Sequence, residues 1–146
     1  SLSLANAAEP SRLNKILNSG ELRIGTTGDW NPMTVKNTAT GNYEGFDIDV
    51  VTELAKDMGV ELKFVPTDWK TLINGVIADK YDMTTSASLN PKRMAVAGYT
   101  DSSYHVGTVP LTLKKHLSKF TSWEAINSSD ISVATTLGLF IIHIGR

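Results

Sequence analysis

The sequence has no cysteine, no excess of charge of either sign and no long apolar run, and each absence excludes a class of protein. Without cysteine the chain has no disulfides, no cysteine-ligated zinc and no iron–sulfur cluster. Lys and Arg number 14 against 15 Asp and Glu, a net charge of −1, and no stretch is basic enough to hold a nucleic-acid backbone. No apolar run approaches the ~20 residues that a membrane-spanning helix needs.

The remaining composition is that of an ordinary soluble domain, with 146 residues of which 41% are hydrophobic. A domain of this size buries roughly 68–70% of the surface of its unfolded chain, which is enough for a core. The glycines form no phosphate-binding motif, and His105, His116 and His143 have neither metal-ligand spacing nor a nucleophile partner. We therefore expect no cofactor, no metal ion and no nucleic-acid partner.

The first ten residues, Ser1 to Pro10, carry small side chains in an Ala-x-Ala arrangement. This pattern is typical of the end of a secretory signal peptide around its cleavage site, which predicts an exported protein. The alternative is a disordered tail rich in Ala and Ser.

Strand and helix patterns alternate over the first hundred residues, which predicts an α/β fold with a parallel sheet. Runs of β-prone residues predict strands at 22–24, 60–65 and 81–85. Apolar residues at helical spacing predict helices after Ser11, over 48–58, over 69–77 with Asp68 as N-cap, and from Asn90 toward Gly98. Farther on we expect a β-rich run at 106–113, a short helix capped by Ser122 and a strand at 131–134.

The start of the helix predicted from Asn90 toward Gly98 suggests an anion site. If Asn90 is the N-cap and Pro91 the first helical residue, Arg93 lies in the first turn, where the helix dipole disfavours a cation. A bound anion would compensate, held by helix N–H groups, the hydroxyls of Ser86 and Ser88, and a guanidinium that grips a carboxylate bidentately. The alternative is a solvated arginine that tolerates a dipole penalty of about 0.3–1 kcal/mol.

Two tryptophans, Trp30 and Trp69, follow predicted strand ends, at the edge where open α/β sheets bind ligands. Two aromatic rings there can enclose a ligand. Trp69 also begins the apolar face of a predicted helix, so a core position is its alternative. Asp47 and Asp49 fall in the first turn of another predicted helix, which is typical of capping, and we interpret them as structural.

Four motifs, in order, carry a resemblance to a known family: Leu22 to Met33, Gly45 to Asp49, Phe64 to Trp69 and Ser86 to Arg93. They resemble the amino-acid-type extracellular solute-binding proteins of ABC transporters, from about Ser11 to Gly138. Within that family the chain is most similar to the cyclohexadienyl dehydratase branch, whose members convert prephenate or arogenate to phenylpyruvate or phenylalanine.

The resemblance implies an α/β, type II periplasmic-binding-protein fold, in which ligand lies between two lobes. It implies that residues 11–113 form the first lobe and 114–138 the beginning of an incomplete second lobe, followed by an atypical apolar tail at 139–146. A periplasmic location and an ABC permease as partner follow from the same resemblance. We expect the chain to be a truncated or frame-shifted product that associates as a homodimer through its incomplete lobe and apolar tail.

The resemblance also assigns roles to six residues. Arg93 and Ser88 match positions that hold the ligand α-carboxylate, Ser86 matches a further polar contact, Trp30 and Trp69 match the aromatic walls, and Thr27 matches a position that tunes side-chain specificity. The expected ligand is an amino acid or a similar small carboxylate. The alternative is a dehydratase acting on prephenate or arogenate, whose catalytic general acid would normally come from the missing lobe.

Overall fold

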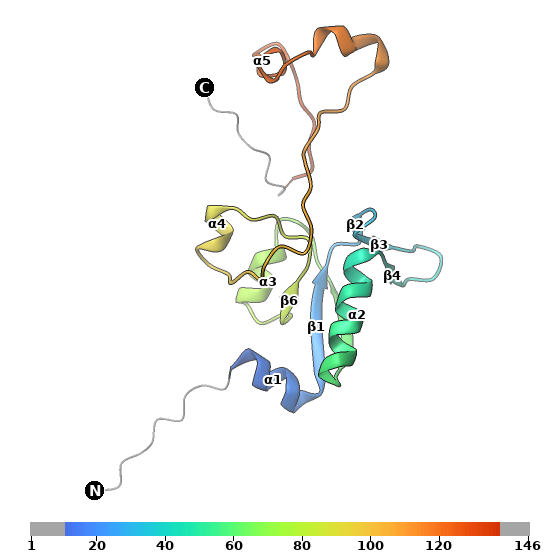
Figure 1. The fold of residues 1–146 in the computed structure, drawn as a ribbon, viewed down its shortest axis with the longest axis vertical. Coiled ribbons are helices and arrows are strands. Elements are labelled where there is room, and N and C mark those ends of the chain that lie inside the picture. Colours follow the sequence, from blue (N-terminus) through green and yellow to red (C-terminus); the bar gives the residue numbers. More distant parts are fainter. Residues whose placement is uncertain (1–10, 138–146) are drawn as a thin grey trace, which may run out of the picture. The chain divides into compact units, whose positions relative to one another are not determined.

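The computed structural model describes residues 11–137, which fall into two compact units (Figure 1). The N-terminal unit ends at Ala97 and the C-terminal unit begins at Gly98. The lobe boundary expected after Leu113 stays a prediction, and the expected signal remnant at 1–10 and apolar tail at 139–146 lie outside the described residues. No helix within the described residues is long and apolar enough to cross a membrane.

A three-stranded parallel sheet with the order β5-β1-β6 forms the centre of the N-terminal unit. Its strands are β1 (Glu21–Thr26), β5 (Glu61–Pro66) and the short β6 (Met83–Thr84). β1 pairs with β5 from Glu21 opposite Glu61 to Thr26 opposite Pro66, and its second half pairs with β6. The predicted parallel sheet is therefore confirmed, with the third strand shorter than expected.

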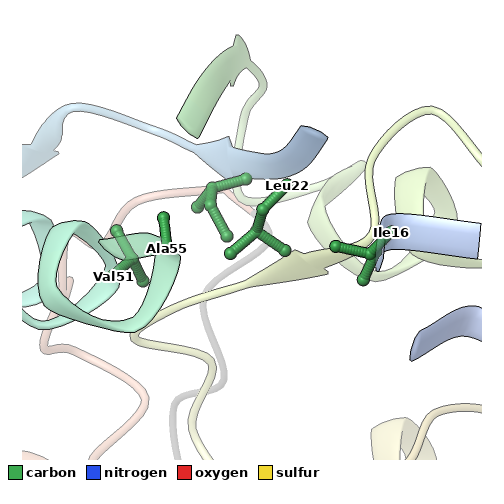
Figure 2. Close-up of a cluster of buried hydrophobic side chains, with 5 residues drawn as sticks. Ile16, Leu22, Val51 and Ala55 are labelled. Atoms are coloured by element: carbon green, nitrogen blue, oxygen red, sulfur yellow. The ribbon is translucent and has the colours of Figure 1, made fainter. Parts of the chain in front are cut away.

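Two helices, α1 (Arg12–Ser19) and α2 (Phe46–Met58), cover the sheet with apolar side chains. The core cluster consists of Ile16, Leu22, Ile24, Val51 and Ala55. Figure 2 shows Leu22 of β1 between Ile16 of α1 and the pair Val51 and Ala55 of α2. Both helices end at a glycine in the left-handed conformation, Gly20 with φ 70° and Gly59 with φ 67°, where a side chain would be strained.

A small antiparallel sheet interrupts the connection from β1 to α2. It consists of β2 (Asp29–Trp30), β3 (Thr34–Lys36) and β4 (Tyr43–Glu44), in that order. Asp29 pairs with Val35 and Trp30 with Thr34, and the buried Thr34 hydroxyl shares a 2.6 Å hydrogen bond with Thr26 of β1. This sheet therefore fixes the backbone of Asp29 and Trp30 beside the carboxyl end of β1.

Tyr81 packs the short helix α3 (Leu72–Ile77) against the central sheet. Its side chain is 1% exposed, and its hydroxyl donates a 2.6 Å hydrogen bond to the carbonyl oxygen of Leu72. Two glycines make room for the ring, because a Cβ at Gly25 of β1 would lie 2.4 Å from it and a Cβ at Gly75 of α3 would lie 2.1 Å from it. Contact at those distances is sterically forbidden, so both positions require glycine.

Two predicted helices are shorter than expected. The helix predicted over 69–77 begins at Leu72, because the Asp68 carboxylate accepts hydrogen bonds from the backbone N and the hydroxyl of Thr71 and closes a separate turn. The helix after Asn90 is α4 (Pro91–Met94), which ends before Gly98. No residue of α4 is buried, so packing does not extend it.

The C-terminal unit contains only two short helices within residues 98–137, the 3₁₀ helix η1 (Lys114–Lys119) and α5 (Trp123–Ile126). The Ser122 hydroxyl accepts from the backbone N of Ala125, which confirms the predicted cap of α5. The predictions of a β-rich run at 106–113 and of a strand at 131–134 are wrong. None of the described residues of this unit is buried and none lies in a strand, so these β-prone segments have no sheet to join.

Four charged residues connect α1, β1 and the start of β6 at the end of the sheet opposite the strand carboxyl ends. Arg23 donates to Asp82 through its backbone N at 2.9 Å, Nε at 3.1 Å and Nη2 at 2.8 Å. Arg12 pairs with both Asp79 and Asp82. Burial alone would raise the pKa of Asp82, but the hydrogen bonds from Arg23 and Arg12 outweigh it and lower that pKa below its ordinary 3.8.

Candidate functional site

The carboxyl ends of the three parallel strands place three predicted site residues at one edge of the sheet. Thr27 directly follows β1, Trp69 lies three residues after β5, and Ser86 lies two residues after β6. The register of the strands aligns these ends, and the backbone N of Thr67 donates a 3.1 Å hydrogen bond to the carbonyl oxygen of Thr26. Ligands of open α/β sheets bind at this edge.

Trp30 and Trp69 lie in contact at this edge, with ring centroids 6.3 Å apart and planes at 81°. This edge-to-face geometry is a favourable one for aromatic pairs. Trp69 is 8% exposed, and its Nε1 donates a 2.9 Å hydrogen bond to the carboxylate of Asp29. The two rings form one aromatic wall, and a ligand that enters between them must part them.

Asp47 connects the loop after β6 to the first turn of α2. Its side chain is 3% exposed, and it accepts a hydrogen bond from the hydroxyl of Ser86, whose φ of 57° places it in the left-handed region. Ser86 is the donor in this bond, which connects the loop after β6 to the first turn of α2. The placement of Asp47 in a first helical turn is confirmed, but its contact with Ser86 has no signal in the sequence.

Asn90 fixes the turn that carries Arg93. The Asn90 side chain is buried and accepts a 2.9 Å hydrogen bond from the backbone N of Arg93, which confirms the predicted cap with Pro91 as the first helical residue. The Arg93 guanidinium bends back over the loop and donates from Nη1 to the carbonyl oxygen of Ser88 at 3.3 Å. Because α4 has only four residues, the charge of Arg93 rather than a helix dipole provides any attraction for an anion.

Thr27 contributes a polar atom without a partner. Its Oγ1 is buried and has no hydrogen-bond partner within the described residues. Leaving a buried hydroxyl unsatisfied costs on the order of 1–3 kcal/mol. A ligand group that bonds to Thr27 Oγ1 would therefore recover this energy.

Two pairs of the six predicted residues are in contact, Trp30 with Trp69 and Arg93 with Ser88. Thr27 follows β1, and Ser86 bonds to Asp47. Sequence patterns do not indicate the contacts of Asp29 with Trp69 and of Asp47 with Ser86. A separate surface hollow of about 490 Å³ between β5 and α3 is lined in part by Pro66, Asn74 and Lys80, and by none of the six.

Comparison with known proteins matches residues 22–129 to the bacterial extracellular solute-binding proteins, family 3. The chain is 35% identical over 132 residues to a cyclohexadienyl dehydratase of Pseudomonas aeruginosa, a match that covers 90% of this chain and 49% of that protein. The chain therefore spans about half the length of this curated relative.

Solved structures that are similar to this chain include an ancestral amino acid-binding protein and an arginine-bound domain. An ancestral amino acid-binding protein, described as a precursor of cyclohexadienyl dehydratase, matches with a TM-score of 0.76 and 35% identity over 82% of this chain and 53% of that one. The arginine-bound form of domain 1 from TmArgBP matches with a TM-score of 0.56 and 31% identity over 60% of this chain and 69% of that one. These likenesses confirm the predicted α/β, type II periplasmic-binding-protein fold. This chain matches only a part of that fold.

Proposed function

Because the chain belongs to the bacterial extracellular solute-binding proteins of family 3, we propose that it binds an amino acid or a similar small carboxylate. We further propose that it does so in the periplasm as the solute-binding component of an ABC transporter, with a permease as its partner. The observation that carries this proposal is the position of the Arg93 guanidinium. Asn90 caps the turn that contains Arg93, and the guanidinium bonds to Ser88 in the loop that follows β6.

Each site residue has a role in this proposal. The Arg93 guanidinium pairs with the ligand carboxylate in a bidentate contact, and Ser88 supports it from the same loop. Ser86, which donates to Asp47, makes a further polar contact with the ligand from the same loop. Trp30 and Trp69 contact the ligand side chain, and the unpartnered Thr27 hydroxyl hydrogen-bonds to it. Binding in this form requires no chemical reaction.

A known relative supports binding by an incomplete two-lobed protein. Domain 1 of TmArgBP is described in an arginine-bound form, and this chain covers 69% of it. This likeness supports the proposal that a single domain with this fold can hold a ligand.

The second candidate function is a dehydratase, favoured by the 35% identity to cyclohexadienyl dehydratase over 90% of this chain. Prephenate or arogenate would use the same Arg93 anchor, and the elimination of water and carbon dioxide would be assisted by a general acid. Steady turnover of either compound by this chain would favour this function over simple binding.

The deciding experiment is calorimetric titration of the chain with the twenty common L-amino acids and with prephenate. We expect one or more to bind, and Arg93→Ala to abolish binding because the carboxylate loses its only bidentate partner among the proposed contacts. Lys92→Ala is the matched control, since it removes an exposed cation of the same turn and should leave the affinity unchanged. Unchanged affinity in Arg93→Ala would refute the anchor.

We also propose that the chain self-associates. Large apolar side chains of the C-terminal unit are exposed, and they include Val109, Leu111, Leu113, Trp123 and Val133. Burying them against a second copy would stabilise this unit by the hydrophobic effect. Native mass spectrometry would report the assembly and any ligand that remains bound, and a monomer over a wide concentration range would contradict self-association.

A further inference from the structure

We infer that Asp29 is a positioning residue, whose carboxylate fixes the indole ring of Trp69 in the orientation that the ligand site uses. This inference rests on the proposed function, because it concerns the aromatic wall of that same site. The observation that carries it is the 2.9 Å hydrogen bond from Trp69 Nε1 to Asp29 Oδ1, which joins residues 40 positions apart in the sequence.

The other hydrogen bonds of this loop hold its backbone and not the Trp69 ring. The backbone N of Thr67 donates to the carbonyl oxygen of Thr26, and the Asp68 carboxylate accepts from the backbone N and hydroxyl of Thr71, each at 2.8 Å. Both contacts leave the Trp69 side-chain torsions free. The bond to Asp29 is directional and acts on the far side of the ring, so it selects one orientation.

Asp29 is itself held firmly enough to act as an anchor. Its backbone pairs with Val35 in the small antiparallel sheet, and the next residue, Trp30, supplies the ring against which Trp69 packs edge to face. One two-residue strand therefore provides both the hydrogen-bond acceptor and the aromatic contact for Trp69. A carboxylate acceptor makes a stronger bond to an N–H donor than a neutral one does.

The first test needs no ligand. In ¹H–¹⁵N spectra of the full chain, the indole Nε1–H resonance of Trp69 is assigned as the cross-peak that Trp69→Phe removes. In Asp29→Ala we expect this resonance to move upfield and its exchange with water to accelerate. Asp29→Asn keeps an acceptor oxygen and should give an intermediate position. Asp57→Ala removes an exposed carboxylate from α2 and should change nothing.

The second test measures affinity for L-arginine, or for whichever probe of the titration panel the unsubstituted chain binds most tightly. We expect Asp29→Ala to weaken binding by about tenfold, Asp29→Asn to remain within about threefold, and Asp57→Ala to bind as the unsubstituted chain does. Melting temperatures of all variants separate this effect from unfolding, and Asp29→Asn keeps the test open if Asp29→Ala does not fold. Rescue by the conservative variant is the result that a purely structural contact would not give.

The outcomes separate this inference from the proposed function. An unchanged indole resonance in Asp29→Ala overturns the positioning role whether or not a ligand binds. A shifted resonance with unchanged affinity also overturns it, because the orientation of Trp69 would then not matter to the ligand. If the unsubstituted chain binds none of the probes, the proposed function fails, and the ligand-free spectra still decide whether Asp29 holds the ring.

Discussion

Asp82 combines near-complete burial of a charge with a full set of partners. Its side chain is 6% exposed, and it accepts three hydrogen bonds from Arg23 and one from Arg12. A buried carboxylate without such partners would be strongly destabilising, whereas a fully hydrogen-bonded one holds the elements that supply its donors. Asp82 therefore connects α1 and β1 to the start of β6.

Acid should remove this contribution. Because the pKa of Asp82 in the folded chain lies below its ordinary 3.8, the stabilisation is complete above about pH 4 and is lost as the pH falls through the lowered pKa. We expect Asp82→Asn to reduce the free energy of unfolding by about 1–3 kcal/mol at pH 7 and to flatten its decline below pH 4. Urea unfolding from pH 2 to 7 measures both effects. Parallel curves for the two proteins would show that Asp82 does not cause the decline.

At the scale of single residues, the sequence predicts best the hydrogen bonds between residues that are close together in the chain. Asn90 and Ser122 cap their helices as predicted, and Ser11 caps the predicted helix that follows it, because a cap bonds to a backbone N only three residues away. The contacts that shape the candidate site join Asp47 to Ser86 and Asp29 to Trp69, 39 and 40 residues apart. Only the fold brings such pairs together, so no local pattern reveals them.

Helix α3 is held to the sheet by the fit of one ring between two glycines. The Tyr81 ring fills the space between Gly25 of β1 and Gly75 of α3, and its hydroxyl bonds to the carbonyl oxygen of Leu72. A helix of six residues is not stable alone, so this packing provides what its own hydrogen bonds cannot.

We expect Gly75→Ala to destabilise the chain by about 1–3 kcal/mol, because the added methyl group would lie 2.1 Å from the Tyr81 ring. In a helix free of such contact the same substitution stabilises. Gly98→Ala is the matched control, since a Cβ there meets nothing within 4 Å, and it should change stability by no more than about 0.5 kcal/mol. Thermal unfolding compares the two, and equal melting temperatures would contradict the proposed fit.

At the scale of elements, the sequence predicts the strands that have a neighbouring strand and fails for those that do not. The amphipathic pattern of α2 and the β-prone runs of β1 and β5 are confirmed. The segments 106–113 and 131–134 carry the same β-prone residues but no strand forms. Strand formation depends on a neighbouring strand, which composition alone does not supply.

The two units of the molecule differ in how they are stabilised. The N-terminal unit has a buried apolar cluster, whereas none of the described residues of the C-terminal unit is buried. Between Ala97 and η1 no residue lies in a helix or a strand. Backbone of this kind opens at little cost in free energy.

Brief treatment with proteinase K should therefore cut first between Gly98 and Leu113. We expect mass spectrometry to find a product that ends in this segment, and far-ultraviolet circular dichroism to find it folded, because the N-terminal unit keeps its own core. The same treatment in urea serves as the control, where cleavage should occur throughout. First cleavage within α2 or β5 would contradict the division into two units.

The contact between Trp30 and Trp69 also has an optical consequence. Two indole chromophores with centroids 6.3 Å apart share their excited states, and such a pair produces paired circular dichroism bands of opposite sign that neither ring gives alone. Trp30→Phe should remove these bands, and a ligand that parts the rings should remove them as well. The chain thus contains an intrinsic spectroscopic reporter of occupancy, readable without a label and before the identity of the ligand is known.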